Sequence, residues 1–240
     1  MPWVALVMIA HPDGEERCTG SLIRGDWVVT AAHCFFHRDR RTGRHVRTEA
    51  RAVRVRSGEL VRFGGDGWRR AAEVIVHERY DRGGPIDHDI ALVRLAPTSE
   101  PSSGGAALPW GEQSVPAGQT LEVAGFGFTE DGGLPDRLMR GEVVALEPSE
   151  CARRLDQEGF AYADPRNVLC AAPGRSSTCY GDSGGPLMRP GLHPPALAGV
   201  SMMGLVGVRG DVRDCLSETL PVYFTRIDRY VAWIEDRTAR

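Results

Sequence analysis

The chain has 240 residues, of which 42% are hydrophobic and 25% are charged. These proportions are ordinary for a soluble globular protein, and this length is enough for one large β domain or two small ones. The formal net charge of −3 gives no overall reason to expect nucleic acid or a membrane surface as a partner. No apolar run approaches the roughly 20 residues that a membrane-spanning helix needs.

The cysteines suggest an oxidising compartment. There are six of them, an even number, and no two form a C-x-x-C pair. Six cysteines allow fifteen pairings, so sequence spacing alone does not choose among them. Residues 1–9 are too short, and lack the basic lead-in and cleavage site, to act as a signal peptide.

Short apolar runs recur along the chain, most of them four to seven residues long and separated by Gly, Pro, Asp or Ser. They are rich in Val, Ile and Leu, which predicts an all-β protein, either a sandwich or barrels. The predicted strands are Val4–Ala10, Trp27–Ala32, Val53–Arg56, Glu73–His77, Ile90–Leu95, Thr120–Ala124, Glu142–Leu146, Ala196–Met202 and Pro221–Phe224.

The basic residues are unusual because all 29 are arginine, and eight of them lie between Arg38 and Arg56. We interpret this stretch as a solvated loop and strand edge. An anion-binding patch is the alternative, but neither aromatic interleaving nor a glycine nest supports it.

Two later segments break the strand pattern. Residues 97–116 are rich in Pro, Ser and Gly and form the best candidate linker between two halves. In Thr225–Arg237 the apolar residues follow helical spacing, and Thr225 with Asp228 is expected to cap an amphipathic helix. A shorter helix is expected at Glu150–Glu158.

The strongest local motif is Gly181-Asp-Ser-Gly-Gly-Pro186. A nucleophilic serine needs an exposed hydroxyl and nearby backbone N–H groups to hold an oxyanion. Glycines beside Ser183 permit the unusual backbone angles and the close approach of a substrate. A simple turn is the alternative, and six matched residues argue against it.

Two further motifs supply a base and a carboxylate. Val28-Val-Thr-Ala-Ala-His33-Cys34 is a strand that leads into a histidine. Asp89 opens the apolar strand Ile90–Leu95, so its carboxylate is expected to be buried and to need a donor such as an imidazole N–H. We assign His88 a surface role, and structural roles to the remaining histidines His11, His37, His45, His77 and His193.

Together these segments resemble the chymotrypsin/trypsin family of serine proteases, which has the same His, Asp, Ser order. The likeness extends to Cys18-Thr-Gly-Ser-Leu-Ile23, the turn Gly125-Phe-Gly127, Gly199-Val-Ser201 and the closing helix at Tyr230–Ile234. It implies two six-stranded antiparallel barrels with the triad between them. The N-terminal barrel would span residues 1–108, the C-terminal barrel with Ser183 and the specificity pocket residues 109–224, and a terminal helix residues 225–240.

The resemblance also implies a mechanism. Ser183 is the nucleophile, His33 the general base and Asp89 the group that orients it, while the N–H groups of Gly181 and Ser183 form the oxyanion hole. Ser201 is expected to pair with the substrate backbone. The implied disulfides are Cys18–Cys34, Cys151–Cys170 and Cys179–Cys215. No cofactor and no metal site are expected.

The specificity pocket departs from the trypsin pattern. Ser177 lies six residues before the nucleophile, where trypsin-type members carry an aspartate for substrate Arg or Lys. Met203 and Val222 lie where roomy pockets have glycine. Cleavage after small or medium uncharged residues is therefore expected, because a basic side chain would be desolvated without a partner.

A second departure concerns Asp182. In the family, a freed Ile/Val-Val-Gly-Gly terminus pairs with the aspartate before the nucleophile, and the printed sequence does not contain that segment. We expect either a truncated form or another donor for Asp182, with His88 or an arginine as candidates. Without a partner, Asp182 would leave the oxyanion hole poorly formed, as in a zymogen.

These inferences define one main hypothesis and one alternative. The main hypothesis is a secreted or extracytoplasmic serine endopeptidase, monomeric, that acts on a protein or peptide substrate and can meet a protein inhibitor; nucleic acid and membranes are not expected partners. The alternative is a catalytically silent or zymogen-like homologue that acts as a protein-binding module. An intact triad favours the enzyme.

Overall fold

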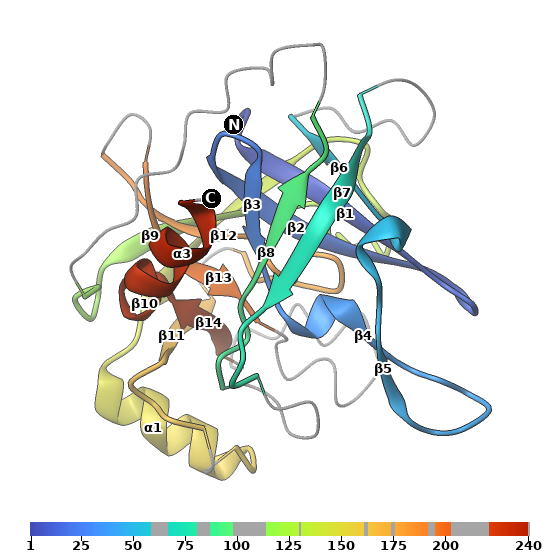
Figure 1. Ribbon diagram of the computed structural model, residues 1–240. Coiled ribbons are helices and arrows are strands. Elements are labelled where there is room, and N and C mark those ends of the chain that lie inside the picture. Colours follow the sequence, from blue (N-terminus) through green and yellow to red (C-terminus); the bar gives the residue numbers. More distant parts are fainter. Residues whose placement is uncertain are drawn as a thin grey trace.

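A computed structural model describes residues 1–58, 67–80, 87–97, 114–129, 131–160, 163–173, 176–191, 195–202 and 221–239. Within these ranges the chain forms two closed antiparallel barrels of six strands each (Figure 1). The predicted all-β, two-barrel architecture with a C-terminal helix is confirmed. The predicted boundary between residues 108 and 109 lies outside the described residues.

The first barrel closes because its first and last strands in space, β1 and β6, pair with each other. Residues 4–9 are almost completely buried, so both faces of this apolar strand are covered, because successive side chains point to opposite faces. The strands in spatial order are β1 (Val4–His11), β2 (Gly14–Arg24), β3 (Trp27–Thr30), β8 (Ala91–Leu95), β7 (Arg69–Val76) and β6 (Val53–Ser57).

The second barrel repeats this arrangement with the later half of the chain. It closes through the pairing of β9 with β10. Its strands in spatial order are β10 (Met139–Ala145), β11 (Val168–Pro173), β14 (Val222–Arg226), β13 (Ala196–Ser201), β12 (Pro186–Arg189) and β9 (Thr120–Gly125). The strands predicted from apolar runs do not include β11 or β12; β11 is itself apolar apart from its final proline, and β12 is only four residues long.

One apolar cluster extends from the first barrel to the C-terminal helix. It includes Met188 and Val200 of the second barrel, and Ile227, Tyr230 and Ile234 near the C-terminus. A second cluster fills the other barrel around Leu121 and Phe224. The two barrels are therefore in apolar contact, and the terminal helix packs onto the larger cluster.

The terminal helix begins later than the sequence suggests. Residues 225 and 226 belong to β14, followed by a 3₁₀ turn, η4 (Ile227–Arg229), and then helix α3 (Val231–Thr238). The expected cap of Thr225 and Asp228 is wrong. Asp228 pairs with Arg226 at 2.5 Å, and the Thr225 hydroxyl donates to the carbonyl oxygen of Asp89.

Three smaller elements lie outside the barrels. Helix α1 (Pro148–Gln157) matches the predicted short helix, and its first residue is a proline, which fits the first helical turn. The turn η1 (His33–Phe35) leads into a two-stranded hairpin of β4 (Phe36–Arg38) and β5 (His45–Arg47). Before β6 lies a further 3₁₀ turn, η2 (Ala50–Ala52).

Two of the three predicted disulfides are present, Cys18–Cys34 and Cys151–Cys170. Each closes a short loop and contributes roughly 3 kcal/mol in the chain-entropy model. Cys179 is also disulfide-bonded, but its predicted partner Cys215 lies outside the described residues. None of the helices in the described ranges has the length and apolarity needed to cross a membrane.

Candidate active site

His33 and Asp89 meet at the surface where the two barrels face each other. The Nδ1 atom of His33 lies 2.7 Å from Oδ2 of Asp89, and the backbone N–H of His33 donates to Oδ1 at 2.8 Å. Both carboxylate oxygens are therefore used by one residue, which fixes the imidazole ring. Asp89 is only 1% exposed, as the sequence suggests for a carboxylate at the start of an apolar strand.

The Asp89 carboxylate makes His33 more basic. Burial of the imidazole lowers its pKa, but the charge and the hydrogen bond of Asp89 outweigh burial, so the pKa of His33 is raised above 6.5. A histidine held in this way has one nitrogen fixed by the carboxylate and leaves Nε2 to accept a proton.

Ser183 lies close to this pair. The Sγ atom of Cys34 is 4.0 Å from both Nε2 of His33 and the carbonyl oxygen of Ser183. Among the described residues, the Ser183 hydroxyl makes no hydrogen bond. The Ser183 backbone and the His33 ring thus both lie beside Cys34, and no bond is formed between the side chains of Ser183 and His33.

The backbone N–H groups of residues 181–185 show a distinctive pattern. The N–H groups of Asp182, Gly184 and Gly185 donate to the carbonyl oxygens of Cys179, Ser201 and Asp182. The N–H groups of Gly181 and Ser183 have no partner among the described residues. Since unpaired backbone donors are rare in folded proteins, this loop holds two donors ready for an acceptor.

Gly181 has to be glycine in this loop. Its φ of +97° lies in the left-handed region, and a Cβ atom there would lie 2.9 Å from the Cα atom of Gly127.

Within the described ranges, the Asp182 carboxylate binds neither His88 nor an arginine. Its Oδ1 accepts the N–H of Gly127 at 2.7 Å, and its Oδ2 accepts the N–H of Cys179 at 2.9 Å. Backbone amides, and not the candidate donors His88 or an arginine, hold this carboxylate in the part of the chain that the structure describes. Burial raises the pKa of the Asp182 carboxyl to about 6, although these two N–H groups lower it.

Room for this carboxylate comes from the turn Gly125-Phe-Gly127. A Cβ atom on Gly125 would lie 2.1 Å from Oδ1 of Asp182, and one on Gly127 would lie 2.5 Å from its Cγ. No side chain can be added at either position without moving Asp182. The Gly-aromatic-Gly motif thus has a steric explanation.

Thr19 is a residue of this site that the sequence argument missed. It lies in β2 of the first barrel and is fully buried. Its N–H donates to the carbonyl of Ser183 at 2.8 Å, and its hydroxyl donates to the carbonyl of Gly181 at 2.8 Å. The same hydroxyl accepts the N–H of Phe126 at 3.3 Å. Thr19 therefore holds both ends of the Gly181–Ser183 segment, and the only signal in the sequence was its place after Cys18.

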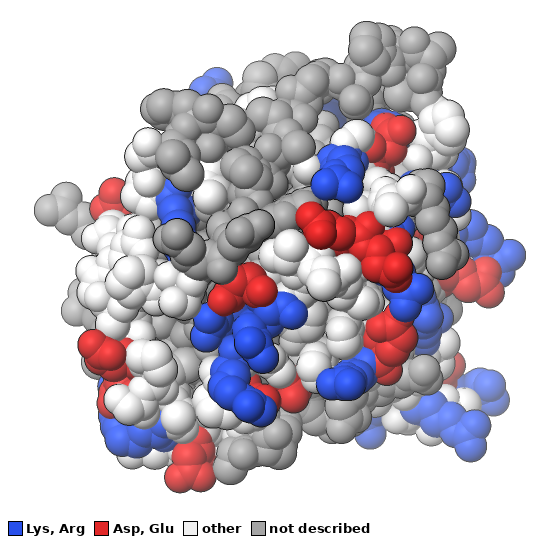
Figure 2. Space-filling view, turned by 60° about the vertical axis from the view of Figure 1, so that its left-hand side comes forward, with Lys and Arg blue, Asp and Glu red and all other residues white. Residues whose placement is uncertain are grey.

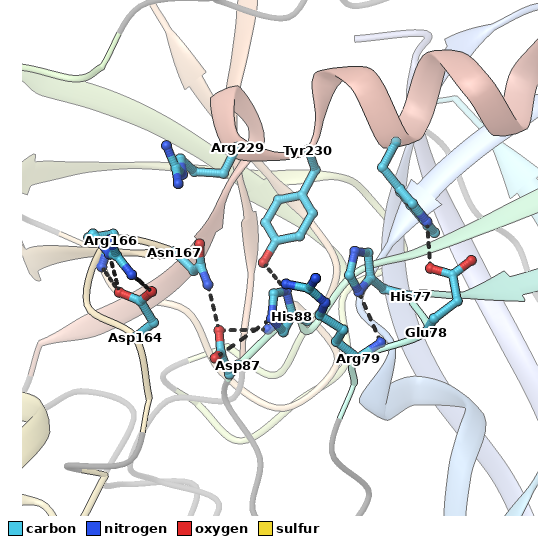
Figure 3. Close-up of a pocket in the computed structure, with 11 residues that line it drawn as sticks. His77, Glu78, Arg79, Asp87, His88, Asp164, Arg166, Asn167, Arg229 and Tyr230 are labelled. Atoms are coloured by element: carbon cyan, nitrogen blue, oxygen red, sulfur yellow. Dashed lines mark hydrogen bonds and ion pairs between the residues drawn. The ribbon is translucent and has the colours of Figure 1, made fainter.

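A polar cavity of about 440 Å³ lies beside Asp87 and His88, on the side of the C-terminal helix (Figure 3). In it the Tyr230 hydroxyl lies 2.9 Å from Nδ1 of His88, and Asn167 donates to Asp87 at 2.8 Å. The lining residues are His77, Glu78, Arg79, Asp87, His88, Asp164, Arg166, Asn167, Arg229, Tyr230 and Trp233.

His88 does not have the surface role that we assigned to it. Its side chain is 16% exposed and stacks on the ring of His77, with centroids 4.7 Å apart. It also has a φ of 56°, which is unusual for a residue with a side chain. Burial, followed by the charge of His88, lowers the pKa of His77 to about 4, so His77 is neutral. These contacts fix the chain just before Asp89.

Three of the four predicted substrate-binding residues are described by the structure, and they differ in burial and in their contacts. Ser201 ends β13, is 2% exposed and already uses its N–H and carbonyl with Gly185 and Gly184. Only the second lone pair of its carbonyl is left for a substrate N–H. Ser177 is half-buried, and Val222 packs in the second apolar cluster beside Phe224. Met203 lies outside the described residues.

Two other features of the surface carry no site. Basic and acidic side chains lie intermixed on the face shown in Figure 2, so this face has no large patch of one sign. In the described part of the chain, the one group of potential metal ligands is Cys18, His33 and Cys34. The two sulfur atoms are joined in a disulfide and are not thiolate ligands.

Comparison with known proteins agrees with this geometry. The trypsin family model matches residues 1–234. Mouse tissue-type plasminogen activator is 30% identical over 98% of this chain and 42% of its own length. Trypsin from Sus scrofa is 28% identical over 94% of this chain and 87% of its own length. Ovochymase from Halocynthia roretzi is 30% identical over 97% of this chain.

The chain belongs to the trypsin family. It spans 42% of the length of the mouse activator and 14% of the length of the ovochymase. The likeness to those two relatives is therefore a likeness of one part of a longer protein.

The buried carboxylate of Asp182 predicts a pH-dependent stability. Its pKa is about 6 in the folded protein and 3.8 when exposed. A raised pKa means that the contribution of this group to stability is fully present below about pH 3.8 and is lost as pH rises through about 6. A shift of this size corresponds to roughly 3 kcal/mol between pH 4 and pH 7.

Urea unfolding at several pH values, without reductant, measures this effect. We expect the free energy of unfolding of the parent to fall by that amount relative to an Asp182→Asn variant. Both proteins should carry Ser183→Ala, which excludes self-cleavage. Parallel stability curves for the two proteins would contradict the burial argument.

Proposed function

We propose that the protein is a serine endopeptidase with Ser183 as nucleophile, His33 as general base and Asp89 as the group that orients His33. The observation that carries the proposal is the pattern of backbone donors at residues 181–185. The two N–H groups without a partner are those of Gly181 and Ser183, on either side of Asp182. They are the pair that an oxyanion formed next to Ser183 requires.

The proposed reaction follows from these positions. The Ser183 hydroxyl attacks the scissile carbonyl carbon while Nε2 of His33 takes its proton. Asp89 stabilises the resulting imidazolium, and the N–H groups of Gly181 and Ser183 donate to the oxyanion. His33 then gives the proton to the leaving amine, and water repeats the sequence on the acyl-enzyme. Every group in this scheme belongs to the chain, so no cofactor is invoked.

Thr19 acts in this scheme as a positioning residue. Its hydroxyl binds the carbonyl of Gly181, so it fixes the peptide group next to the oxyanion donor without touching the substrate. Its N–H binds the carbonyl of the nucleophile itself. An oxyanion hole depends on donors held within a few tenths of an ångström, and a buried hydrogen bond supplies that constraint.

The proposed substrates are proteins or peptides in an extended conformation. The free lone pair of the Ser201 carbonyl is the acceptor for a substrate N–H, which would extend the sheet beyond β13. We further propose an extracytoplasmic location, which fits the disulfides, and a monomeric enzyme that a protein inhibitor can block.

The proposed enzyme and a silent homologue differ in reactivity at Ser183. We expect a fluorophosphonate probe to label the protein, and Ser183→Ala to abolish labelling. Ser183→Ala or His33→Ala should lower peptide hydrolysis by several orders of magnitude. An unchanged melting temperature in each variant is the control for folding. An unlabelled but folded parent would favour the binding module.

A second test separates the hydroxyl of Thr19 from its bulk. Thr19→Val keeps the volume but removes the donor to Gly181, so we expect kcat to fall about tenfold or more, towards the cost of losing one oxyanion donor. KM should change little, and Thr19→Ser should restore most of kcat because it keeps the hydroxyl. Equal losses in Val and Ser variants would show that Thr19 is only a packing residue.

The proposed specificity is for small or medium uncharged residues before the scissile bond. A basic side chain buried near Ser177 would lack a charge partner, and so we expect kcat/KM for an Arg peptide at least about 100-fold below that for a matched Ala, Val or Leu peptide. Ser177→Asp should reverse the order if Ser177 is the pocket floor. A dominant preference of the parent for Arg would contradict the pocket assignment.

A further inference from the structure

The hairpin β4–β5 leaves the body of the protein directly after η1, the 3₁₀ turn that begins at His33. It begins one residue after η1 and forms a two-stranded sheet of its own, separate from both barrels. Figure 1 shows it projecting from the body on the opposite side from β9 to β14. It is therefore an arm attached beside the catalytic histidine and not part of the frame.

The arm has a charge opposite to that of the rest of the protein. Residues 36–47 contain five arginines and one aspartate, a net charge of +4. Because the whole chain carries −3, the remaining residues together carry −7. Residues 40–47 are all exposed. The bland interpretation of the arginine-rich stretch as a solvated loop does not account for this separation of charge.

The arginines at the tip have little to bind within the protein. Arg40 lies 3.5 Å from Asp13, but its side chain is 82% exposed. The guanidinium groups of Arg41 and Arg44 form no ion pair in the part of the chain that the structure describes. Asp39 binds the N–H and the hydroxyl of Thr42 through its Oδ1, and its single charge is already counted in the net charge of +4.

The arm is held in one shape before any partner binds. The N–H of Asp39 donates to the carbonyl of Arg44 at 2.9 Å, and the N–H of Gly43 donates to the carbonyl of Asp39 at 2.7 Å. Gly43 has a φ of +68°, which closes the turn.

Contacts at the base anchor the arm to the first barrel. The rings of His37 and His11 lie 4.3 Å apart, and Arg47 donates to the carbonyl of Val74 at 2.8 Å. An isolated hairpin of two strands is only marginally stable, so these contacts explain why the arm is ordered.

The length of the arm sets how far from the scissile bond it reaches. β4 covers two residue steps, from Phe36 to Arg38, which span about 7 Å. The turn beyond it and the length of an extended arginine side chain bring the reach of the tip to roughly 17 Å. An extended peptide covers the same distance in about five residues. The tip can therefore meet residues four to six positions from the bond.

The position of the arm also decides which half of the substrate it faces. Ser177 and Ser201, which we assign to the residue before the scissile bond, belong to the second barrel. The two halves of an extended substrate leave the bond in opposite directions. The hairpin is anchored to the first barrel through the contacts of His37 with His11 and of Arg47 with Val74, so we place it on the side of the half that leaves as the amine.

We propose that Arg40, Arg41 and Arg44 form a recognition arm for acidic residues at the fourth to sixth positions after the scissile bond. This inference rests on the proposed endopeptidase function and names a class of substrate for it. Guanidinium groups match carboxylates in geometry and keep their charge at any working pH. A polyanionic polymer is the rival partner, but the arm has no aromatic residue at its tip and is too short to follow a long polymer.

Matched peptides test the arm. Three substrates share one cleavable core and carry three Glu after the bond, three Gln after it, or three Glu on the other side. Exposed ion pairs are individually weak, and three of them predict about a tenfold higher kcat/KM for the first peptide. The preference should disappear at about 0.5 M salt, where exposed charges are screened, and in the triple variant R40Q/R41Q/R44Q.

A second triple variant controls for net charge. R70Q/R137Q/R229Q removes three exposed arginines from other elements, and it should keep the preference for Glu. All variants should hydrolyse the Gln peptide at the parental rate, because none of these residues is part of the catalytic machinery. A preference that is equal on both sides of the bond, or that survives R40Q/R41Q/R44Q, overturns the proposal.

The readouts separate this inference from the proposed function. If the Gln peptide is not cleaved at all, the endopeptidase function fails, and fluorescence anisotropy of the Glu peptide then decides the arm alone. Binding that is lost in R40Q/R41Q/R44Q but kept in the control supports an acidic-peptide site. Tip-dependent binding of a heparin oligosaccharide with no effect of Glu on kcat/KM or anisotropy assigns the arm to polyanions and overturns the proposal.

Discussion

The residues of the proposed triad are divided between two barrels, and two buried hydroxyl groups form hydrogen bonds from one barrel to the other. Thr19 of the first barrel binds the carbonyl of Gly181 in the second, and Thr225 of the second barrel binds the carbonyl of Asp89 in the first. Each barrel thus donates a hydrogen bond to a segment of the other barrel, Gly181–Ser183 in one case and Asp89 in the other. Apolar contact between the barrels is non-directional and tolerates sliding, whereas a hydrogen bond sets distance and angle together. Together with the bond from the N–H of Thr19 to the carbonyl of Ser183, these two bonds help to set the position of His33 relative to Ser183.

The buried carboxylate of Asp182 shows how the loop conformation is tied to the frame. Its two oxygens bind N–H groups from different segments, Gly127 and Cys179. Turning this carboxylate out would break both bonds and release Gly127, which packs under Gly181. The conformation of residues 181–185 that leaves the N–H groups of Gly181 and Ser183 without partners among the described residues is therefore coupled to the burial of the Asp182 carboxylate. A carboxyl with a pKa of about 6 is costly to keep ionised there, so any group that lowered that pKa would also stabilise the loop.

Local patterns in the sequence predicted the parts of this protein whose causes are local. Apolar runs predicted strands such as β1 and β13, and the burial of Asp89 followed from the strand it opens. The bonds of Thr19 and Thr225 were not predictable, because each joins residues more than one hundred positions apart. A buried threonine has no sequence pattern that names its partner. The same reason explains why His88, with a tyrosine 142 positions away, was taken for a surface residue.

The basic arm is a part of the structure whose sequence is not constrained by the pairing of strands in the two barrels. Residues whose hydrogen bonds join the two barrels, such as Thr19 and Thr225, are constrained by the alignment of His33 with Ser183. The hairpin β4–β5 lies outside the barrels and is much less constrained by it. Its charges also act over a short range, because the screening length is about 8 Å at physiological salt. In the described part of the chain Arg40 pairs with Asp13 of the body at 3.5 Å, whereas Arg41 and Arg44 form no ion pair. A projecting arm can hold a charge opposite to that of its own protein, and under the proposed function a substrate bound beside His33 would reach it.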